Sequence, residues 1–518
     1  MTLLPTTSIF HKSYPNQLGW RQLELAPRSE GRNSISPLVR KPLLSLIHIS
    51  DTHICDAQSP ARVEYLDRYA DPHHPASSFL GTLVGTYRAQ EILTTQVLES
   101  MVQSANMIDQ APLTGAFIDA VIITGDVTDN AQINELNWAS TLLAGGILTP
   151  DSGALSEWEG AGGSYYSPFF WNPHGTPQGA KEDFPRYLYG YPTIPELLHA
   201  VRAPFIATGL THEYLLVHGN HDALLQGTVA PDVLLRKIAT SDTKIFQLSD
   251  EEALQALQKV TEVGPARYPE PLTAEMRKVA PDSERDFLEE LTWQKKFALP
   301  NQEESINPVR YWRKDYEHLT ILALDTVNPF GGWQGSIDKA QFIWLKEQVT
   351  SNPNRYIAIS SHHPVHTIIN GFTTEPEARI LGDEIKNFLI SQPNVIAWIC
   401  GHNHRNKVEY FGPSPESGFW QIETASLIDW PQQGRVIEIF LDKTDQIGIA
   451  STPIEHQGIV APNYAQLPLD DVTTLAGLSR LLSLNDWQRR EGPFIVEHNE
   501  GRELDRYGIV WLPKRLKI

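Results

Sequence analysis

Five short apolar segments, each ending in a group of aspartate, asparagine or histidine residues, constrain the fold of this chain most strongly. They are "LLSLIHIS" (43–50), "DAVIITG" (119–125), "EYLLVHG" (213–219), "YIAIS" (356–360) and "NVIAWIC" (394–400). Continuous apolar, β-branched runs of this length are typical of strands that are buried on both faces of a sheet. Open α/β sheets place their sites just beyond the carboxyl ends of such strands. The sequence therefore predicts an α/β fold with a site where these strands end.

Helical patterns lie between the predicted strands. Residues 130–146 and 336–349 repeat apolar side chains every three or four positions, and we expect Ser336 to cap the second helix. After residue 405 the pattern returns to strands, and residues 474–488 again have a helical pattern. This order indicates one elaborated α/β domain.

We expect the domain to occupy residues 43–460, preceded by an N-terminal arm (1–42) and followed by a C-terminal extension (461–518) packed on it. Two long insertions interrupt it, at about 146–212 and 224–305. The first is rich in Gly, Pro, Tyr and Trp, which favours a folded cap or rim. The alternative is a decoration with no catalytic contact.

The overall charge of the 518-residue chain limits its partners. The net charge of −20 repels polyanions and disfavours nucleic acid as a partner, whereas metal ions can reverse the local sign for a small phosphorylated substrate. No apolar run is long enough for a membrane span, and the N-terminus lacks the pattern of a signal peptide. Because Cys55 and Cys400 are the only cysteines, we expect a reducing, cytoplasmic location. The oligomeric state stays open.

The polar groups at the strand ends are "SDTH", "TGDVTD", "HGNHD", "SHHP" and "CGHNH". A single histidine in such a position is more often a packing residue than a metal ligand. Five such groups are stronger evidence for a site than one histidine, because the carboxyl ends of parallel strands converge on one crevice. Convergence of aspartate, asparagine and histidine is what a divalent metal site requires. The sequence therefore predicts a metal site built from five distant segments.

The order Asp-x-His, Gly-Asp-x-x-Asp, Gly-Asn-His-Asp, His-x-Pro, Gly-His-x-His resembles the calcineurin-like metallophosphoesterase superfamily. The segment "TILALDT…GSIDKAQFIWLKEQ" is similar to its cyclic-nucleotide-phosphodiesterase-like branch. "DTHICDAQSPARVEYLDR" and "GDVTDNAQINELNW" resemble an uncharacterised bacterial subgroup. The resemblance implies a four-layer α/β/β/α sandwich of the metallophosphoesterase type, here with two long insertions.

The resemblance also implies a dinuclear centre of two divalent or trivalent metal ions, with Mn, Fe or Zn suited to the donors. One ion would be held by Asp51, His53 and His404 and the other by Asn220, His362 and His402, with Asp126 bridging them. A metal-bridging hydroxide would attack a small phosphomonoester or phosphodiester in line. The implied enzyme is a phosphoric ester hydrolase.

Two further residues receive catalytic roles from the resemblance. His221 would donate a proton or a hydrogen bond to the leaving oxygen, and Asp129 would orient it. Asp222 is an alternative support for His221.

Neighbours of these motifs receive other interpretations. Arg62 and Arg405 are candidate phosphate-facing cations, against a default of solvated side chains. His48, Cys55 and Cys400 are expected to pack in the interior, and His363 either packs or supports the site.

Two alternative functions stay open, a nuclease and a non-catalytic binding scaffold, whereas a protein phosphatase is disfavoured. "GDVTDN" and "GNHD" differ from the Arg-Gly and Gly-Asn-His-Glu continuations of serine/threonine protein phosphatases, which disfavours that activity. A nuclease would need a basic stripe beside the metals, and "VRYWRKD" (309–315) is short and mixed in charge. A non-catalytic binding scaffold would be expected to lack a ligand or His221, and the sequence has them all.

Overall fold

The structure, a computed structural model, describes most of the chain. The described residues are 3–28, 39–77, 85–163, 165–260, 262–269, 274–289, 292–297, 310–490 and 495–516. Parts of the predicted arm (29–38) and of the second insertion (270–273, 290–291 and 298–305) lie outside them.

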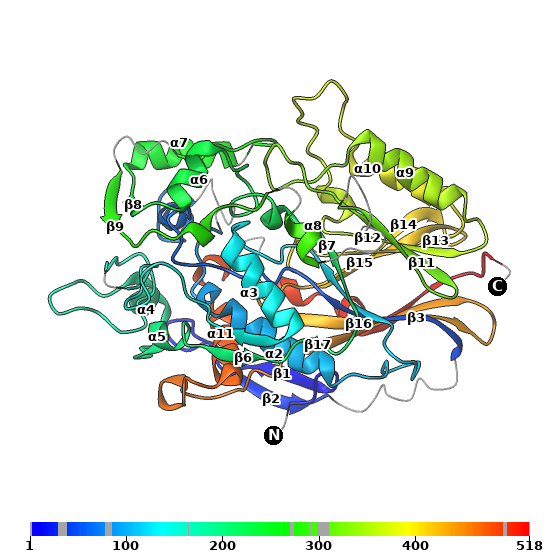
Figure 1. Cartoon of the computed structure of the whole chain (residues 1–518). Helices are drawn as coiled ribbons and strands as arrows, with labels where there is room; N and C mark the ends of the chain where they lie inside the picture. The colour runs from blue at the N-terminus through cyan, green and yellow to red at the C-terminus, as the bar shows by residue number, and fades with distance from the viewer. Residues whose placement is uncertain are drawn as a thin grey trace.

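Two six-stranded mixed sheets form the centre of the molecule (Figure 1). The first has the order β18-β17-β16-β3-β4-β7, with bounds Gly508–Leu512, Ile447–Glu455, Gln433–Asp442, Val39–Ile49, Ala120–Thr124 and Tyr214–Val217. The second has the order β10-β11-β12-β13-β15-β14, with bounds Trp312–Asp315, Leu319–Leu324, Tyr356–Ser361, Val395–Cys400, Ser417–Glu423 and Lys407–Ser414. All five strands predicted from the apolar segments are present, as β3, β4, β7, β12 and β13.

Parallel pairing brings the strand ends that carry the motifs together. In the first sheet β3 pairs with β4 and β4 with β7, and in the second β12 pairs with β13, each pair in parallel. The apolar segment of each of these strands is buried, from Leu43 onwards in β3, because its residues are apolar on both faces. The five polar groups therefore leave the two sheets at the same edge of the molecule.

Helices cover the outer faces of the sheets. α9 (Lys339–Thr350) and α10 (Gly382–Ile390) pack on the second sheet through a core that includes Leu345 and Ile385. α2 (Thr94–Asn106) and α3 (Ile133–Ala144) lie against the first sheet, and α11 (Val472–Leu484) packs on α2. The predicted four-layer α/β/β/α sandwich is confirmed. The predicted cap of α9 is wrong, because Asp338, and not Ser336, accepts the hydrogen bond from the Gln341 amide, at 2.7 Å.

Both ends of the chain add strands around this sandwich. β1 (Ser8–Lys12) and β2 (Leu23–Pro27) form a separate two-stranded sheet. β18, near the C-terminus, pairs with β17 and so becomes an edge strand of the first sheet. In the part of the chain that the structure describes, no helix combines the length and apolar character needed to cross a membrane.

The two insertions contain short elements of their own. The first holds β5 (Gly146–Leu148), α4 (Phe184–Tyr189), α5 (Leu197–Ala200) and β6 (Phe205–Ala207). The second holds α6 (Val233–Ala239), β8 (Thr243–Gln247), α7 (Asp250–Val260), β9 (Glu275–Lys278) and α8 (Thr292–Phe297).

Asp56 lies five residues after Asp51, at the start of the Asp-x-His motif, and it connects both insertions to this motif. Its two carboxylate oxygens each lie 2.8 Å from the Ser152 hydroxyl, and one also lies 3.2 Å from Nε of Arg285. Asp56 and Arg285 are fully buried. Burial alone would raise the pKa of Asp56, but Arg285 and the hydrogen-bond donors hold the pKa below its usual value. The insertions are therefore anchored next to the predicted metal site.

Replacing Arg285 by methionine is expected to lower the free energy of unfolding by about 3–5 kcal/mol, because the Asp56 carboxylate would stay buried without its charge partner. Denaturant unfolding followed by circular dichroism measures this. The matched control is Lys278→Met, since the Lys278–Asp242 pair on the same insertion is 74% and 59% exposed and should contribute less than about 1 kcal/mol. Equal losses in the two variants would contradict the role given to Asp56.

Candidate metal centre

The predicted ligands occupy unusual backbone conformations at the strand ends. Five of them have a positive φ: Asp51 (52°), His53 (44°), Asp126 (49°), His402 (75°) and His404 (57°). A non-glycine residue in this left-handed region costs about 1–3 kcal/mol, and such conformations concentrate at functional sites. These sharp turns end the strands, and the ligating atoms that follow them lie close together.

Asp51, His53 and His404 form the first group of ligating atoms. Nε2 of His53 lies 3.1 Å from Nε2 of His404, which is itself 3.3 Å from Oδ1 of Asp51. All three residues are buried. The structure thus brings together the three residues predicted for one ion.

His362 and His402 bring a second group of ligating atoms together, and Asn220 is the residue that the sequence predicts as their partner. Nε2 of His362 lies 3.1 Å from Nδ1 of His402. Asn220 donates from Nδ2 to the carbonyl oxygen of Gly227, at 3.0 Å, which fixes the orientation of its amide. Its Oδ1 is buried and has no hydrogen-bond partner among the described residues. A buried carbonyl oxygen without a donor is available to coordinate a metal ion.

Asp126 lies between the two groups. Its Oδ2 is 3.1 Å from Nε2 of His362 and 3.8 Å from Nε2 of His53. Its Oδ1 accepts the backbone N–H of His221, at 2.8 Å. Oδ2 alone is therefore the oxygen positioned between the two sets of donors, and Oδ1 holds the loop that carries His221.

The donors fit transition-metal ions in type and spacing. Two nitrogens that bind one ion at about 2.0–2.1 Å lie about 3 Å apart when they are near a right angle to each other. The His53–His404 and His362–His402 nitrogens both have this separation, at 3.1 Å. Imidazole and carboxylate donors suit Mn, Fe and Zn. The residues present are thus compatible with two ions.

The charged residues of the centre shift one another's pKa values. Burial alone would raise the pKa of Asp126, but His362, His221 and His53 hold it well below its usual range. Burial alone would lower the pKa of His362, but Asp126 raises it to about 9. Without an ion, His362 is therefore protonated at neutral pH.

Metal binding is expected to release protons at pH 7, because a histidine must lose its proton to act as a ligand. His362, whose pKa is about 9, competes with the ion below that pH. Metal affinity should rise about tenfold per pH unit towards pH 9 for each proton displaced. Calorimetric titration with Mn²⁺ in buffers of different ionisation enthalpy counts the protons, and a count of zero would contradict this ligand assignment.

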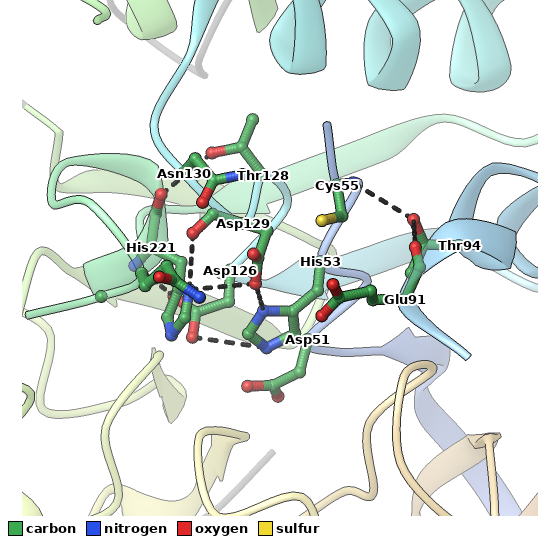
Figure 2. Close-up of polar contacts among 12 residues, drawn as sticks. Asp51, His53, Cys55, Glu91, Thr94, Asp126, Thr128, Asp129, Asn130 and His221 are labelled. Carbon is green, nitrogen blue, oxygen red and sulfur yellow. Dashed lines mark hydrogen bonds and ion pairs between the residues drawn. The ribbon is translucent and has the colours of Figure 1, made fainter. Parts of the chain in front are cut away.

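Asp129 connects the centre to His221, as Figure 2 shows. Its carboxylate Oδ1 lies 3.0 Å from Nδ1 of His53 and 3.4 Å from Nδ1 of His221. The backbone carbonyl of Asp129 lies closer to His221 Nδ1, at 2.8 Å. His221 is 18% exposed, more than the other histidines around Asp129, so its ring reaches towards the opening. Asp129 is thus in place to orient both a metal ligand and His221.

Gly227, in the left-handed region at φ 65°, packs against the same histidine. A Cβ atom here would lie 2.4 Å from Nε2 of His221 and 2.3 Å from Nδ2 of Asn220. Gly227→Ala is therefore expected to displace both side chains and to lower kcat by about 100-fold, the size of effect that a misplacement of about 1 Å produces. Steady-state kinetics measures this, with Gly179→Ala as control, since Gly179 is also left-handed but has no atom within 4 Å of its Cβ position.

Asp222 and Arg62 have roles other than those expected from the sequence. Asp222 accepts from the amides of Val127 and Thr128 and so holds the motif loop, whereas the ring of His221 is held by Asp129. Arg62 is buried and cannot face a phosphate; it pairs with Asp129 at 2.5 Å and with Glu91 at 2.8 Å. The expectation for Arg62 is wrong because its position near a motif did not reveal its burial.

Of the remaining neighbours, His363 contacts two predicted ligands, because its ring centroid lies 4.3 Å from that of His402 and 4.9 Å from that of His362. His48 and His363 are fully buried, and both ring nitrogens of each have partners: the hydroxyls of Thr124 and Thr424 for His48, and the hydroxyl of Thr326 and carbonyl of Trp333 for His363. Burial raises the pKa of the Cys55 and Cys400 thiols, which keeps them neutral. Arg405 is partly exposed and pairs with Glu423 at 3.1 Å.

Asp429 is the functional residue that the sequence did not indicate. Its Oδ2 lies 2.6 Å from Nδ1 of His404 and fixes which nitrogen of that ring faces the metal site. It follows β15 in "SLIDWP", which contains no motif of the centre. A single aspartate at a strand end is the only signal that the sequence offered.

Comparisons with known proteins give distant likenesses. No protein-family model and no curated protein sequence matches the chain. Among solved structures, a purple acid phosphatase from yellow lupin (Lupinus luteus) seeds is 9% identical, with a TM-score of 0.29, over 86% of this chain and 56% of that one. A protein assigned as a 5′-nucleotidase from Staphylococcus aureus is 11% identical (TM-score 0.27, 84% and 58% covered). The sulfate thiohydrolase SoxB of T. thermophilus is 9% identical (TM-score 0.29, 84% and 60%). The chain spans less than two thirds of the length of each.

Proposed function

We propose that the chain is a dinuclear metallophosphoesterase of the calcineurin-like superfamily. The observation that carries the proposal is the convergence of six side chains from four strand ends on one buried point: Asp51, His53, Asp126, His362, His402 and His404. The buried amide oxygen of Asn220, which has no hydrogen-bond partner among the described residues, supports it further. Asp51, His53 and His404 would hold one ion, and Asn220, His362 and His402 the other. Asp126 would contact both.

When bound, two such ions act as Lewis acids on a phosphoryl group and lower the pKa of water towards about 7. The protein supplies the proton for the leaving group. Burial alone would lower the pKa of His221, but Asp126 and Asp129 raise it above its ordinary value. Since Nδ1 of His221 is held by Asp129, Nε2 is the nitrogen that would deliver a proton to the leaving oxygen.

The substrate class that fits this site is a small phosphomonoester or phosphodiester. The net charge of −20 opposes long polyanions, whereas the two ions would offset the charge of a single phosphoryl group. The same charge argues against a nuclease. A non-catalytic scaffold is opposed by the presence of every donor together with His221.

The proposal is tested by an activity screen after reconstitution with Mn²⁺, Fe²⁺ or Zn²⁺. Bis-p-nitrophenyl phosphate, p-nitrophenyl phosphate, and 2′,3′- and 3′,5′-cyclic nucleotides are compared with single-stranded and duplex DNA. We expect metal-dependent turnover of at least one small ester and weak activity on DNA. Metal-dependent cleavage of DNA alone would support the nuclease, and metal binding without turnover of any ester would support the scaffold.

A further inference from the structure

Two arginines that are far apart in the sequence meet beside the metal centre. Nε of Arg88 lies 2.9 Å from Oδ1 of Asp429, and Nη1 of Arg489 lies 2.7 Å from Oδ2 of the same carboxylate. Arg88 precedes the short helix η2 (Glu91–Leu93), whereas Arg489 ends η7 (Trp487–Arg489) in the C-terminal extension. Asp429 is also the residue that holds His404, so the pair lies one carboxylate away from a predicted metal ligand.

Each of the two guanidinium groups has a hydrogen-bond donor that is not used within the part of the protein that the structure describes. Nη1 of Arg88 donates to the carbonyl of Gly85, at 3.2 Å, but neither Nη2 group has a partner among the described residues. Both Nη2 groups lie near one point. A Cβ placed on Gly85 would lie 3.2 Å from Nη2 of Arg88 and 4.0 Å from Nη2 of Arg489. Their side chains are 11% and 19% exposed. Two converging, unsatisfied guanidinium edges form a typical anion-binding arrangement.

Both arginines have Asp429 as their nearest carboxylate. Asp429 is one negative charge shared by two arginines. A second carboxylate, Asp486, lies 3.8 Å from Nε of Arg489. Asp129 and Glu91 also act on the charge of Arg88. A single aspartate would be positioned adequately by one arginine, so the second arginine calls for a further explanation.

We propose that Arg88 and Arg489 form a subsite for a second anionic group of the substrate, next to the ion held by Asp51, His53 and His404. This inference rests on the proposed function. It narrows the substrate to a phosphoester that carries a second phosphate or a carboxylate several bonds from the reacting phosphorus. It also gives the C-terminal extension a direct role in substrate selection.

The test measures binding of a ligand series to the metal-reconstituted full chain by calorimetry. The probes are α,ω-alkanediol bisphosphates of three to six carbons, ω-phosphoalkanoates of the same lengths, and the matching alkyl monophosphates. We expect one length to bind about 10–100-fold more tightly than its monophosphate, as one or two charge-assisted hydrogen bonds would give. The bisphosphate and phosphoalkanoate arms show whether the second group is a phosphate or a carboxylate.

Variants separate the subsite from a purely structural role. Arg88→Gln and Arg489→Gln should each weaken binding of the ligands with a second anion more than binding of the monophosphates, so that the ratio of the two affinities falls towards one, with metal content measured for every variant. Gly85→Ala should reduce the advantage without removing a charge, because its methyl group enters the space between the Nη2 groups. Arg502→Gln, in the same extension and 74% exposed, should change nothing.

Three results would overturn the subsite. If no bisphosphate or phosphoalkanoate bound better than its monophosphate to the metal-loaded wild type, the subsite alone would be wrong. If Arg489→Gln lost metal and weakened both kinds of ligand equally, Arg489 would act only through Asp429 on His404. If the wild type bound neither metal nor monophosphate, the proposed function would fail, and the subsite with it.

Discussion

Replacing Asp126 by asparagine is expected to lower kcat by more than about 100-fold. Loss of a group that merely supports a metal ligand costs about 10–100-fold in metal affinity or activity, and Asp126 would contact both ions directly. Its Oδ2 lies near ring nitrogens from both groups, and Oδ1 holds the loop of His221. The amide would also leave the protonated His362 without the carboxylate that raises its pKa.

Steady-state kinetics on the best small ester, together with metal analysis, measures the effect. Asp232→Asn is the matched control, because Asp232 only caps α6 by accepting from the Leu235 amide and asparagine caps equally well. Its rate should equal that of the wild type. An Asp126→Asn variant with full metal content and unchanged kcat would contradict a hydrolytic role for the centre.

His221→Ala is expected to lower kcat by about 10²–10⁴-fold on esters with poor leaving groups. The reason is that an alkoxide needs a proton as it leaves, whereas p-nitrophenolate does not. The pKa of His221 is raised by Asp126 and Asp129 against the opposing effect of burial, so the ring stays protonated to higher pH than a free histidine. The loss should therefore shrink from alkyl to phenyl to p-nitrophenyl phosphate.

Kinetics across this leaving-group series, with metal content monitored, distinguishes proton donation from metal loss. His199→Ala, at an exposed histidine of the first insertion, should leave every rate unchanged. An equal decrease for all three leaving groups would mean that His221 supports the site in another way.

The parts of the site that could be predicted are those encoded by local sequence. Each ligand pair directly follows an apolar run, so burial of the strand and the position of its polar end are visible together, as for Asp51 and His53 after β3. The parallel order of the strands then places the five ends at one edge. The conformation of the ends was not visible, because the left-handed residue Asp126 is held by amides from distant segments, those of His53 and His221.

The supporting contacts could not be predicted, because they join segments with no common motif. Asp429 meets His404 from a different strand end, and Arg489 reaches it from the C-terminal extension. Arg62 is a charged residue of a type that is usually exposed, and it is nevertheless buried against Asp129. Asp56 gained its role only from the fold of the two insertions. In each case tertiary packing, and not local pattern, decides what the side chain contacts.

The central claim, that this chain holds two ions at the converging strand ends, is tested most directly by anomalous diffraction from crystals of the Mn²⁺-reconstituted protein. The prediction is two anomalous peaks per chain, one beside Asp51, His53 and His404 and the other beside Asn220, His362 and His402, with Asp126 between them. Peaks located elsewhere, or none at saturating Mn²⁺, would contradict it.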